Sequence, residues 1–166
     1  MIKKISILFI FSLFLLFACS SNNEISYSEN KIIKLEKQND SLFLLYHVVN
    51  DSVVSSWQFN FEVKKISVCY LNEDSIPEIA VMVNKSTRYW KEKENRLFIF
   101  KLYKSQYIRP LWLGSKTAGR LTDFSIQKDS IPNLIVVDCV MDNCQKKAVF
   151  TLGGFGLKFL YFCNCI

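Results

Sequence analysis

The sequence predicts an all-β protein, and three observations support this fold class. No stretch after residue 30 shows sustained helical periodicity, whereas short runs of alternating apolar and polar residues recur along the chain. Clusters of Asn, Asp, Ser and Pro separate these runs, as expected for turns. The segment DSIP at residues 74–77 also returns at residues 129–132, a distance of 55 residues. We therefore expect about twelve strands arranged as an internal repeat.

The chain begins with a segment typical of an exported protein. Residues 1–4 are basic, and residues 5–17 are almost unbroken Ile, Leu and Phe. Because this run is too short to span a membrane comfortably, residues 1–18 predict a signal peptide. The tetrapeptide LFAC that ends at Cys19 resembles the lipobox of bacterial lipoproteins, which implies cleavage before Cys19 and diacylglycerol on its thiol. An ordinary signal peptide and an uncleaved anchor are the alternatives.

The mature chain divides into a tether and one domain. Residues 19–30 are polar and lack periodicity, so we expect lipidated Cys19 to be followed by a flexible tether. Residues 31–166 are then a single all-β repeat domain. Several acyl chains, palmitate among them, would hold the protein durably on a membrane. Ser20 stands where an Asp would favour inner-membrane retention, which favours an outer membrane lipoprotein by analogy with Gram-negative bacteria.

Each copy of the repeated segment occupies the same place in a pattern of four strands. A strand precedes it, an aliphatic run follows it, and two more strands complete the unit. A period of about 50 residues is typical of a propeller blade. The aliphatic runs 79–83 and 134–137 are apolar on both faces and predict interior strands. The predicted strands are 63–71, 79–83, 97–103 and 107–113 in the first unit, and 121–127, 134–137, 146–152 and 156–162 in the second.

An earlier and weaker unit precedes these two. Residues 53–61 alternate between apolar and polar, and residues 31–61 are long enough for a shorter unit. The triplet DSL at 40–42 resembles the repeated segment without its spacing. We therefore expect about three four-stranded antiparallel blade-like units, that is, a partial propeller. Three blades do not readily close a ring, so a twisted β-sandwich and an open arc completed by a partner are the alternatives.

The loops that contain the repeated segment resemble a known family. Residues 70–78 and 125–133 are similar to the D-x-[DN]-x-D-G-x-x-[DE] loop of FG-GAP or VCBS-type repeats. The segments TRY at 87–89, RLFIF at 96–100 and GFG at 154–156 add to a similarity with uncharacterised bacterial proteins that spans roughly residues 57–166. The resemblance implies blades of a β-propeller and carries no known activity.

In that family the loop oxygens often hold calcium. Here Asn72, Asp74 and Glu78 remain as a vestigial calcium loop, and Asp129 is the last carboxylate in the second loop. Because calcium affinity follows the number of carboxylates, we expect no cofactor, with weak calcium binding at the first loop as the alternative. We expect Asp74 and Asp129 to accept hydrogen bonds from the backbone of their own turns instead.

The cysteines and the single histidine suggest no catalytic or zinc site. Export permits a disulfide between Cys139 and Cys144, which flank a predicted hairpin turn, and inert thiols are the alternative. The spacing C-x4-C followed by C-x-C fits zinc poorly. His47 lies in a strand-like run, where a packed or surface role is commonest, and the sequence has no G-x-S-x-G elbow. We expect no enzyme, with a small hydrolase on a β scaffold as the alternative.

The polar stretch 85–96 is the candidate contact site. It is longer than a hairpin requires and contains Arg88, Tyr89, Trp90 and Arg96. Such side chains are enriched where proteins bind partners, so we expect non-catalytic binding of an envelope protein or a glycan. A solvated loop with its aromatic rings folded back, in a purely structural envelope component, is the alternative. The net charge of +6 includes no run of Lys and Arg, which argues against nucleic acid.

Overall fold

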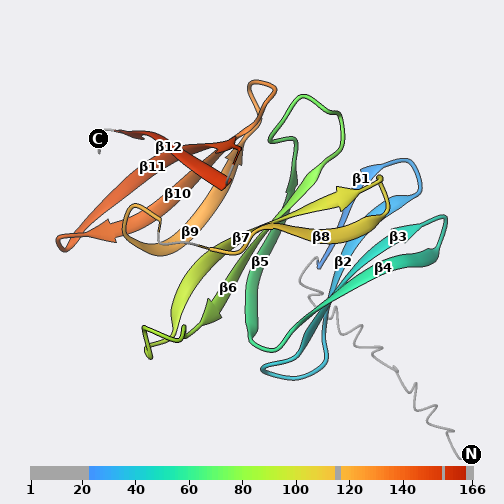
Figure 1. The fold of residues 1–166 in the computed structure, drawn as a ribbon, viewed down its shortest axis with the longest axis horizontal. Coiled ribbons are helices and arrows are strands. Elements are labelled where there is room, and N and C mark those ends of the chain that lie inside the picture. The colour runs from blue at the N-terminus through green and yellow to red at the C-terminus, as the bar shows by residue number, and fades with distance from the viewer. Residues whose placement is uncertain (1–22, 115–116, 155, 164–166) are drawn as a thin grey trace, which may run out of the picture.

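The computed structural model describes residues 23–114, 117–154 and 156–163, and it confirms the all-β prediction. Twelve strands form three four-stranded antiparallel sheets, and these described ranges contain no helix. Within each sheet the strands follow chain order, so every sheet is a meander of hairpins (Figure 1). Sheet A contains β1 (Glu24–Ser28), β2 (Lys31–Lys37), β3 (Phe43–Val49) and β4 (Ser52–Phe59). Sheet B contains β5 (Glu62–Cys69), β6 (Glu78–Lys85), β7 (Glu94–Tyr103) and β8 (Tyr107–Trp112). Sheet C contains β9 (Arg120–Gln127), β10 (Leu134–Met141), β11 (Cys144–Gly153) and β12 (Gly156–Cys163).

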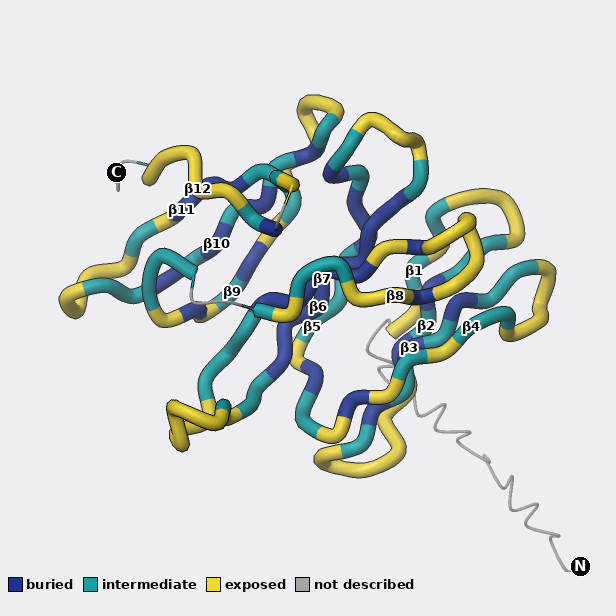
Figure 2. Tube along the Cα trace, in the orientation of Figure 1, coloured by how far each residue is buried: buried dark blue, intermediate teal, exposed yellow. Residues whose placement is uncertain are grey.

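Sheet B lies between sheets A and C and shares a hydrophobic core with each of them (Figure 1). In β6, Ile79, Val81 and Val83 belong to the core with sheet A, whereas Ala80 and Met82 belong to the core with sheet C. Successive side chains of a strand point to opposite faces, and both faces of this strand are covered. The prediction of an interior strand at 79–83 is therefore confirmed, and Figure 2 shows buried residues concentrated along β6 and β7.

Residues 134–137 in β10 also lie in an interior strand, between β9 and β11, but the prediction of burial on both faces is wrong for them. Ile135 and Val137 are fully buried, but Leu134 and Val136 on the opposite face are only half-buried. Sheet C is the last sheet in the described stack, so its second face has no sheet above it. The aliphatic run is the same in both units, and the position of the unit in the stack makes the difference.

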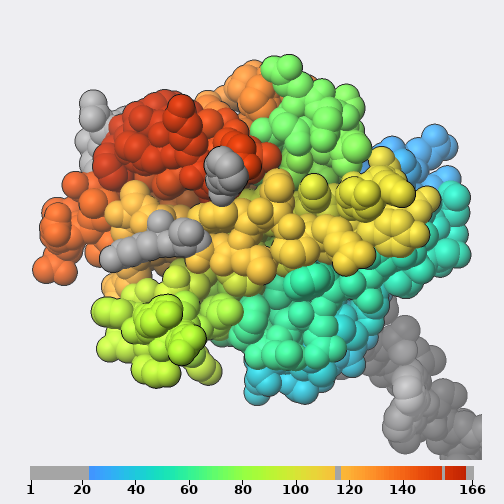
Figure 3. Space-filling model, viewed as in Figure 1, coloured from blue at the N-terminus to red at the C-terminus, as the bar shows by residue number. Residues whose placement is uncertain are grey.

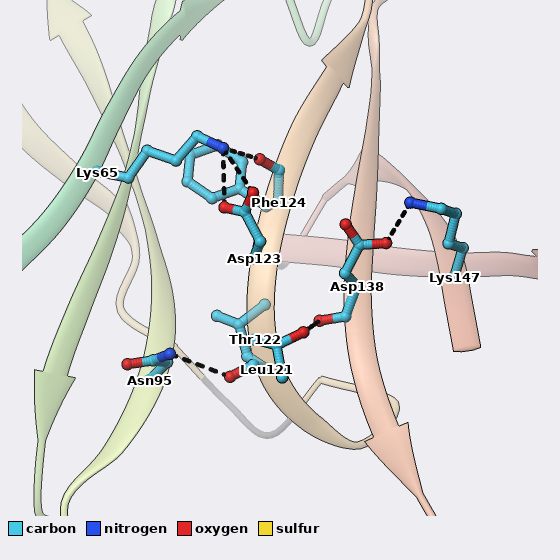
Figure 4. A network of polar contacts seen from close by, with 8 residues as sticks. All are labelled: Lys65, Asn95, Leu121, Thr122, Asp123, Phe124, Asp138 and Lys147. Atoms are coloured by element: carbon cyan, nitrogen blue, oxygen red, sulfur yellow. Dashed lines mark hydrogen bonds and ion pairs between the residues drawn. The ribbon is translucent and has the colours of Figure 1, made fainter. Parts of the chain in front are cut away.

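Hydrogen bonds and an ion pair connect sheet C to sheet B (Figure 4). Lys65 Nζ in β5 donates to both carboxylate oxygens of Asp123, at 2.8 and 3.0 Å, and to the carbonyl oxygen of Phe124 at 2.6 Å. Asp123 lies opposite Asp138 in the register of β9 and β10, and Lys147 forms an ion pair with Asp138. The second face of sheet C thus carries the ion pair of Asp138 and Lys147 beside the half-buried Leu134 and Val136.

The predicted tether is wrong for its last part. Residues 24–28 form β1, which pairs with β2 and completes the four strands of sheet A. Two apolar residues at the spacing of one strand face, Ile25 and Tyr27, pack against the core between sheets A and B. Glu24 adds an ion pair with Lys34 at 2.9 Å. The alternation of EISYS is a short strand signal, and packing on the core together with pairing to β2 holds the strand in place.

The triplet 40–42 is not a third copy of the repeated loop. It lies between β2 and β3, which is the second hairpin of sheet A, whereas the repeated loops join the first two strands of sheets B and C. The counterpart in sheet A is the two-residue turn at Glu29 and Asn30, where Asn30 has a φ of 55°. Asn tolerates this left-handed conformation better than most residues, so the turn needs no longer loop.

The predicted turn role of aspartate holds in one copy of the repeat. Asp74 Oδ1 accepts a hydrogen bond from the backbone N–H of Ile76 at 2.8 Å, which confirms the prediction. Asp129 Oδ2 instead accepts from the side-chain amide of Gln127 at 3.2 Å, so the prediction is wrong for the second copy.

The two repeated loops contact each other directly, and they lie side by side at the top of Figure 1. Asn133 Oδ1 accepts from the backbone N–H of Tyr70 at 2.8 Å, and the Asn133 N–H donates to the Tyr70 carbonyl oxygen at 2.6 Å. Asn133 is 4% exposed and occupies the position that Glu78 holds in the first copy. The repeated segment therefore also joins sheet B to sheet C.

Candidate functional site

The loop of residues 85–93, between β6 and β7, presents its aromatic side chains to solvent. The Thr87 N–H donates to the Trp90 carbonyl oxygen at 2.8 Å, and the Trp90 N–H donates to Thr87 Oγ1 at 3.0 Å. This turn leaves Tyr89 88% exposed and Trp90 50% exposed. The Arg88 guanidinium lies 5.7 Å from the centre of the Tyr89 ring. The aromatic rings do not fold back onto the sheet, and Figure 3 shows the loop as a lime-coloured projection at the lower left.

A cleft of about 460 Å³ lies between sheets A and B on one side of this loop, and we call it the AB cleft. The β2–β3 turn, the β4–β5 connection and the end of β6 line it. Lys37 Nζ contacts Asp40 Oδ1 at 2.7 Å, and Lys85 Nζ lies 4.6 Å from the ring centre of Phe61. Two of its cations therefore already have partners within the chain.

A second cleft, of about 330 Å³, lies between sheets B and C, and we call it the BC cleft. The start of β7, residues 117–121 and the end of β10 line it, so it occupies the same place relative to sheet B and sheet C that the AB cleft occupies relative to sheet A and sheet B. The charged residues in its lining are Glu94, Arg96, Arg120 and Asp142. Along the chain, the loop 85–93 lies between the end of β6, which lines the AB cleft, and the start of β7, which lines the BC cleft.

The four predicted contact residues do not form one cluster. Arg88, Tyr89 and Trp90 lie together at the loop, but Arg96 lies within β7, its side chain is 14% exposed, and it lines the BC cleft. Sequence reasoning missed the BC cleft, which forms only through the packing of sheet C on sheet B. No local pattern could have found it, because its lining comes from three separate segments, residues 94–97, 117–121 and 140–142.

The vestigial calcium loop holds its oxygens in its own hydrogen bonds. Glu78, 2% exposed, accepts from the Leu71 N–H at 2.9 Å and from Asn72 Nδ2 at 2.8 Å. Asn72 Oδ1 accepts from the Asp74 N–H at 3.0 Å. Burial raises the pKa of Glu78 to about 7, and the nearby charge of Asp74 adds to the effect. Calcium would have to replace these hydrogen bonds, which disfavours its binding. The absence of a cofactor stays a prediction.

His47 is a packed residue that ties sheet A to sheet B. It is fully buried, and its Nδ1 lies 2.7 Å from the Gln106 carbonyl oxygen. A carbonyl oxygen can only accept, so Nδ1 carries the proton and Nε2 accepts from the Tyr27 hydroxyl at 2.6 Å. Burial lowers the pKa of His47 and raises the pKa of Tyr27 to about 12. Both ring nitrogens are occupied, so this imidazole is not free to act as a base.

The predicted disulfide is wrong. Cys139 is buried and free, and Cys144 is exposed and free. The turn consists of two residues, Asp142 and Asn143, which places Met141 opposite Cys144 and Cys139 opposite Lys146. The predicted turn itself is confirmed. Cys19 and Cys165 lie outside the described residues.

Comparison with known proteins adds no assignment: no family model, no curated protein and no solved structure matches the chain. Within residues 23–114, 117–154 and 156–163, no helix is long and apolar enough to cross a membrane. The same ranges contain no group of three or more His, Cys, Asp or Glu residues that could hold a metal ion.

Proposed function

We propose that the protein is a lipid-anchored cell-envelope protein of the outer membrane, with a non-catalytic role in binding a protein or glycan partner. The leader that ends at Cys19 supports the anchor. The observation that carries the binding role is the exposed pair Tyr89 and Trp90, which a hydrogen-bonded turn holds at the end of β6, a strand buried on both faces.

Physical reasons favour this loop as the contact. Aromatic side chains bury a large area with few rotatable bonds, so they contribute binding energy at low entropic cost. Arg88 lies against the Tyr89 ring and can pair with an acidic group or stack on a planar one. The loop begins and ends in β6 and β7, the two central strands of the middle sheet, so its base is rigid.

Two observations favour binding over catalysis. The buried imidazole of His47 is engaged at both nitrogens. The carboxylates of Asp123 and Asp138, which lie opposite each other, are each paired with a lysine (Figure 4). A hydrolase requires a free base or nucleophile within reach of a bound substrate, and these groups do not supply one.

Replacing Cys19 by Ala should release the protein from the membrane fraction. The acyl chains provide the binding energy, at about 0.8 kcal/mol per buried methylene, and the variant has no thiol to carry them. Incorporation of a fatty-acid analogue and membrane fractionation measure the effect, with the free-thiol variant Cys144→Ala as the control. Unchanged labelling of the Cys19→Ala variant would disprove the anchor.

Replacing Arg88 and Trp90 together by Ala should reduce recovery of a cross-linked envelope partner by about tenfold or more, because truncation of hot-spot residues costs about 2 kcal/mol or more. The melting temperature should change little, since Arg88 is exposed and Trp90 is 50% exposed. The matched control replaces Tyr103 and Lys104, an exposed aromatic–cation pair in the β7–β8 turn. Equal loss in both double variants, or unfolding of the first, would remove the loop as the contact site.

A further inference from the structure

The last strand of sheet C is an unprotected edge. β12 ends the order β12-β11-β10-β9, and within the part of the chain that the structure describes no strand pairs with its other side. Edge strands usually avoid pairing with other chains through short length, charges or proline. The other five edges have such features or are strongly polar: β1 has five residues, β8 contains Arg109 and Pro110, β5 and β9 carry charges of both signs, and half of β4 is serine or glutamine. β12 has eight residues, and Lys158 is its single charge.

Four consecutive large apolar residues of β12 face solvent. Phe159, Leu160, Tyr161 and Phe162 are between 38% and 50% exposed. A contiguous apolar surface of this kind usually marks a site of association. Figure 3 shows β12 as the red surface at the upper left. β1, which follows the tether, belongs to the sheet at the opposite end of the stack, so the described end of the tether lies away from this edge (Figure 1).

The register with β11 defines the faces of β12. Phe159 lies opposite Phe150, and Phe162 lies opposite Ala148. Phe150 and Ala148 belong to the core between sheets B and C, so both phenylalanine rings of β12 lie on the face toward sheet B. Their centroids are 4.9 Å apart, and the Phe159 ring also contacts Phe150 at 5.7 Å. Leu160 is the extra residue where the register shifts, so this aromatic row continues across a bulge up to the open edge.

We propose that β12 forms the interface of a homodimer, in which the β12 strands of two copies pair antiparallel about a two-fold axis between Leu160 and Tyr161. Phe159 of each copy then lies opposite Phe162 of the other. Side chains directly opposite each other on antiparallel strands are about 4.5–5.5 Å apart, so the aromatic row continues across the interface. The two copies of sheet C, four strands each, join into one antiparallel sheet of a size that is common in proteins.

The strand is complementary to itself, which favours a second copy over an unrelated chain. In this register Lys158 lies opposite Cys163 of the other copy, so the two lysines do not face each other. Lys158 and Cys163 both lie on the face away from sheet B, so this pair is also matched. A shift of one residue would place Phe159 opposite Tyr161, whose side chains lie on different faces. The two-fold axis makes the contact isologous, so the dimer is closed.

Disulfide trapping in intact cells tests this register, because Cys163 is a free thiol. In the variant Lys158→Cys, the introduced thiol of one copy lies opposite Cys163 of the other, at a Cα separation of about 4.5–5.5 Å that suits a disulfide. Within one chain the two positions lie about 17 Å apart along the strand, which is too far for a bridge. A mild oxidant should therefore convert the variant to a covalent dimer in non-reducing electrophoresis.

Matched variants show whether trapping reports the proposed interface. Lys158→Cys combined with Cys163→Ser should lose the dimer, and Lys104→Cys, in the exposed β7–β8 turn, should give about a tenth of it or less. Adding Tyr161→Lys to Lys158→Cys should lower the yield about tenfold or more, because it places a charge at the centre of the edge. Tyr103→Lys, at a similarly exposed tyrosine of β7, should leave the yield unchanged.

Sedimentation of the full chain in detergent provides a measurement without engineered thiols. The protein mass should correspond to two chains for the wild type and to one chain for Tyr161→Lys. If Lys158→Cys does not fold, this pair of masses decides the test.

Three results would overturn the homodimer. These are the absence of the trapped dimer in a folded Lys158→Cys variant, equal trapping through Lys104→Cys, and a dimer that Tyr161→Lys retains. A trapped product that joins Cys163 to a different envelope protein would also overturn it and would indicate a heterologous partner strand. The inference does not depend on the 85–93 loop, so Lys158→Cys with Arg88→Ala and Trp90→Ala should be trapped in the same yield, and the loop assignment and this interface can fail separately.

Discussion

Replacing Phe100 by Ala should lower the free energy of unfolding by about 3–5 kcal/mol. Phe100 in β7 is fully buried, and its ring contacts Trp57 and Phe59 of sheet A at centroid distances of 5.3 and 5.6 Å. Truncation removes this contact between sheets and leaves a cavity that a close-packed core fills only partly. Denaturation in urea, followed by circular dichroism, measures the change.

Phe159→Ala is the matched control for this prediction. Phe159 in β12 also contacts two aromatic rings, those of Phe150 and Phe162, but it is 42% exposed. We expect a loss of about 1 kcal/mol or less, because little area leaves water when this ring packs. Similar losses for the two variants would show that the stack of sheets does not depend on the core between sheets A and B.

Raising the pH from 5 to 8 should lower the free energy of unfolding by about 3 kcal/mol, because the buried carboxyl group of Glu78 ionises over this range. Its pKa rises from 4.5 in the unfolded chain to about 7 in the folded protein, because the carboxyl group is buried. Between these values the folded state holds a proton that the unfolded state has released, so the free energy of unfolding falls as pH rises. The decline should end above the folded pKa, and the two values imply about 3 kcal/mol. Urea denaturation at intervals across this range measures it.

Glu78→Gln is the control, because glutamine keeps an oxygen that can accept from the Leu71 N–H and cannot ionise. His47 acts in the opposite direction: its folded pKa is lowered, so stability gained as pH rises toward its unfolded value partly offsets the loss. The difference between the wild type and Glu78→Gln therefore isolates the carboxyl group. A difference that stays constant with pH would show that Glu78 is ionised throughout.

The exposed half of the candidate site could be predicted from sequence. A polar stretch longer than its hairpin requires, with Tyr89 and Trp90 in it, indicates side chains outside the sheet, and the structure exposes both. The clefts could not be predicted. The lining of each cleft comes from two sheets and the connection between them, so each cleft exists only when the sheets have packed together. The residues that a strand contacts on a neighbouring sheet cannot be inferred from the order of residues along that strand.

The sequence by itself determined most of the strands, the turns and the number of units. Predicted strands at 97–103 and 107–113 correspond to β7 and β8, and the two copies of DSIP occupy the same loop of sheets B and C. These features are local, because alternation and turn residues act on a few neighbouring positions. The internal repeat can be read from the sequence for the same reason, because its turn residues and strand patterns are local features that recur.

Only the tertiary structure decided which faces are covered. The runs 79–83 and 134–137 look alike, yet the first is buried on both faces and the second on one, since sheet B has a neighbour on each side and sheet C has one. The strand at 24–28, through Ile25 and Tyr27, and the lining of the BC cleft depend on the same packing. Apolar periodicity indicates which side chains of a strand are buried from water. The order in which the sheets stack decides which residues pack against those side chains.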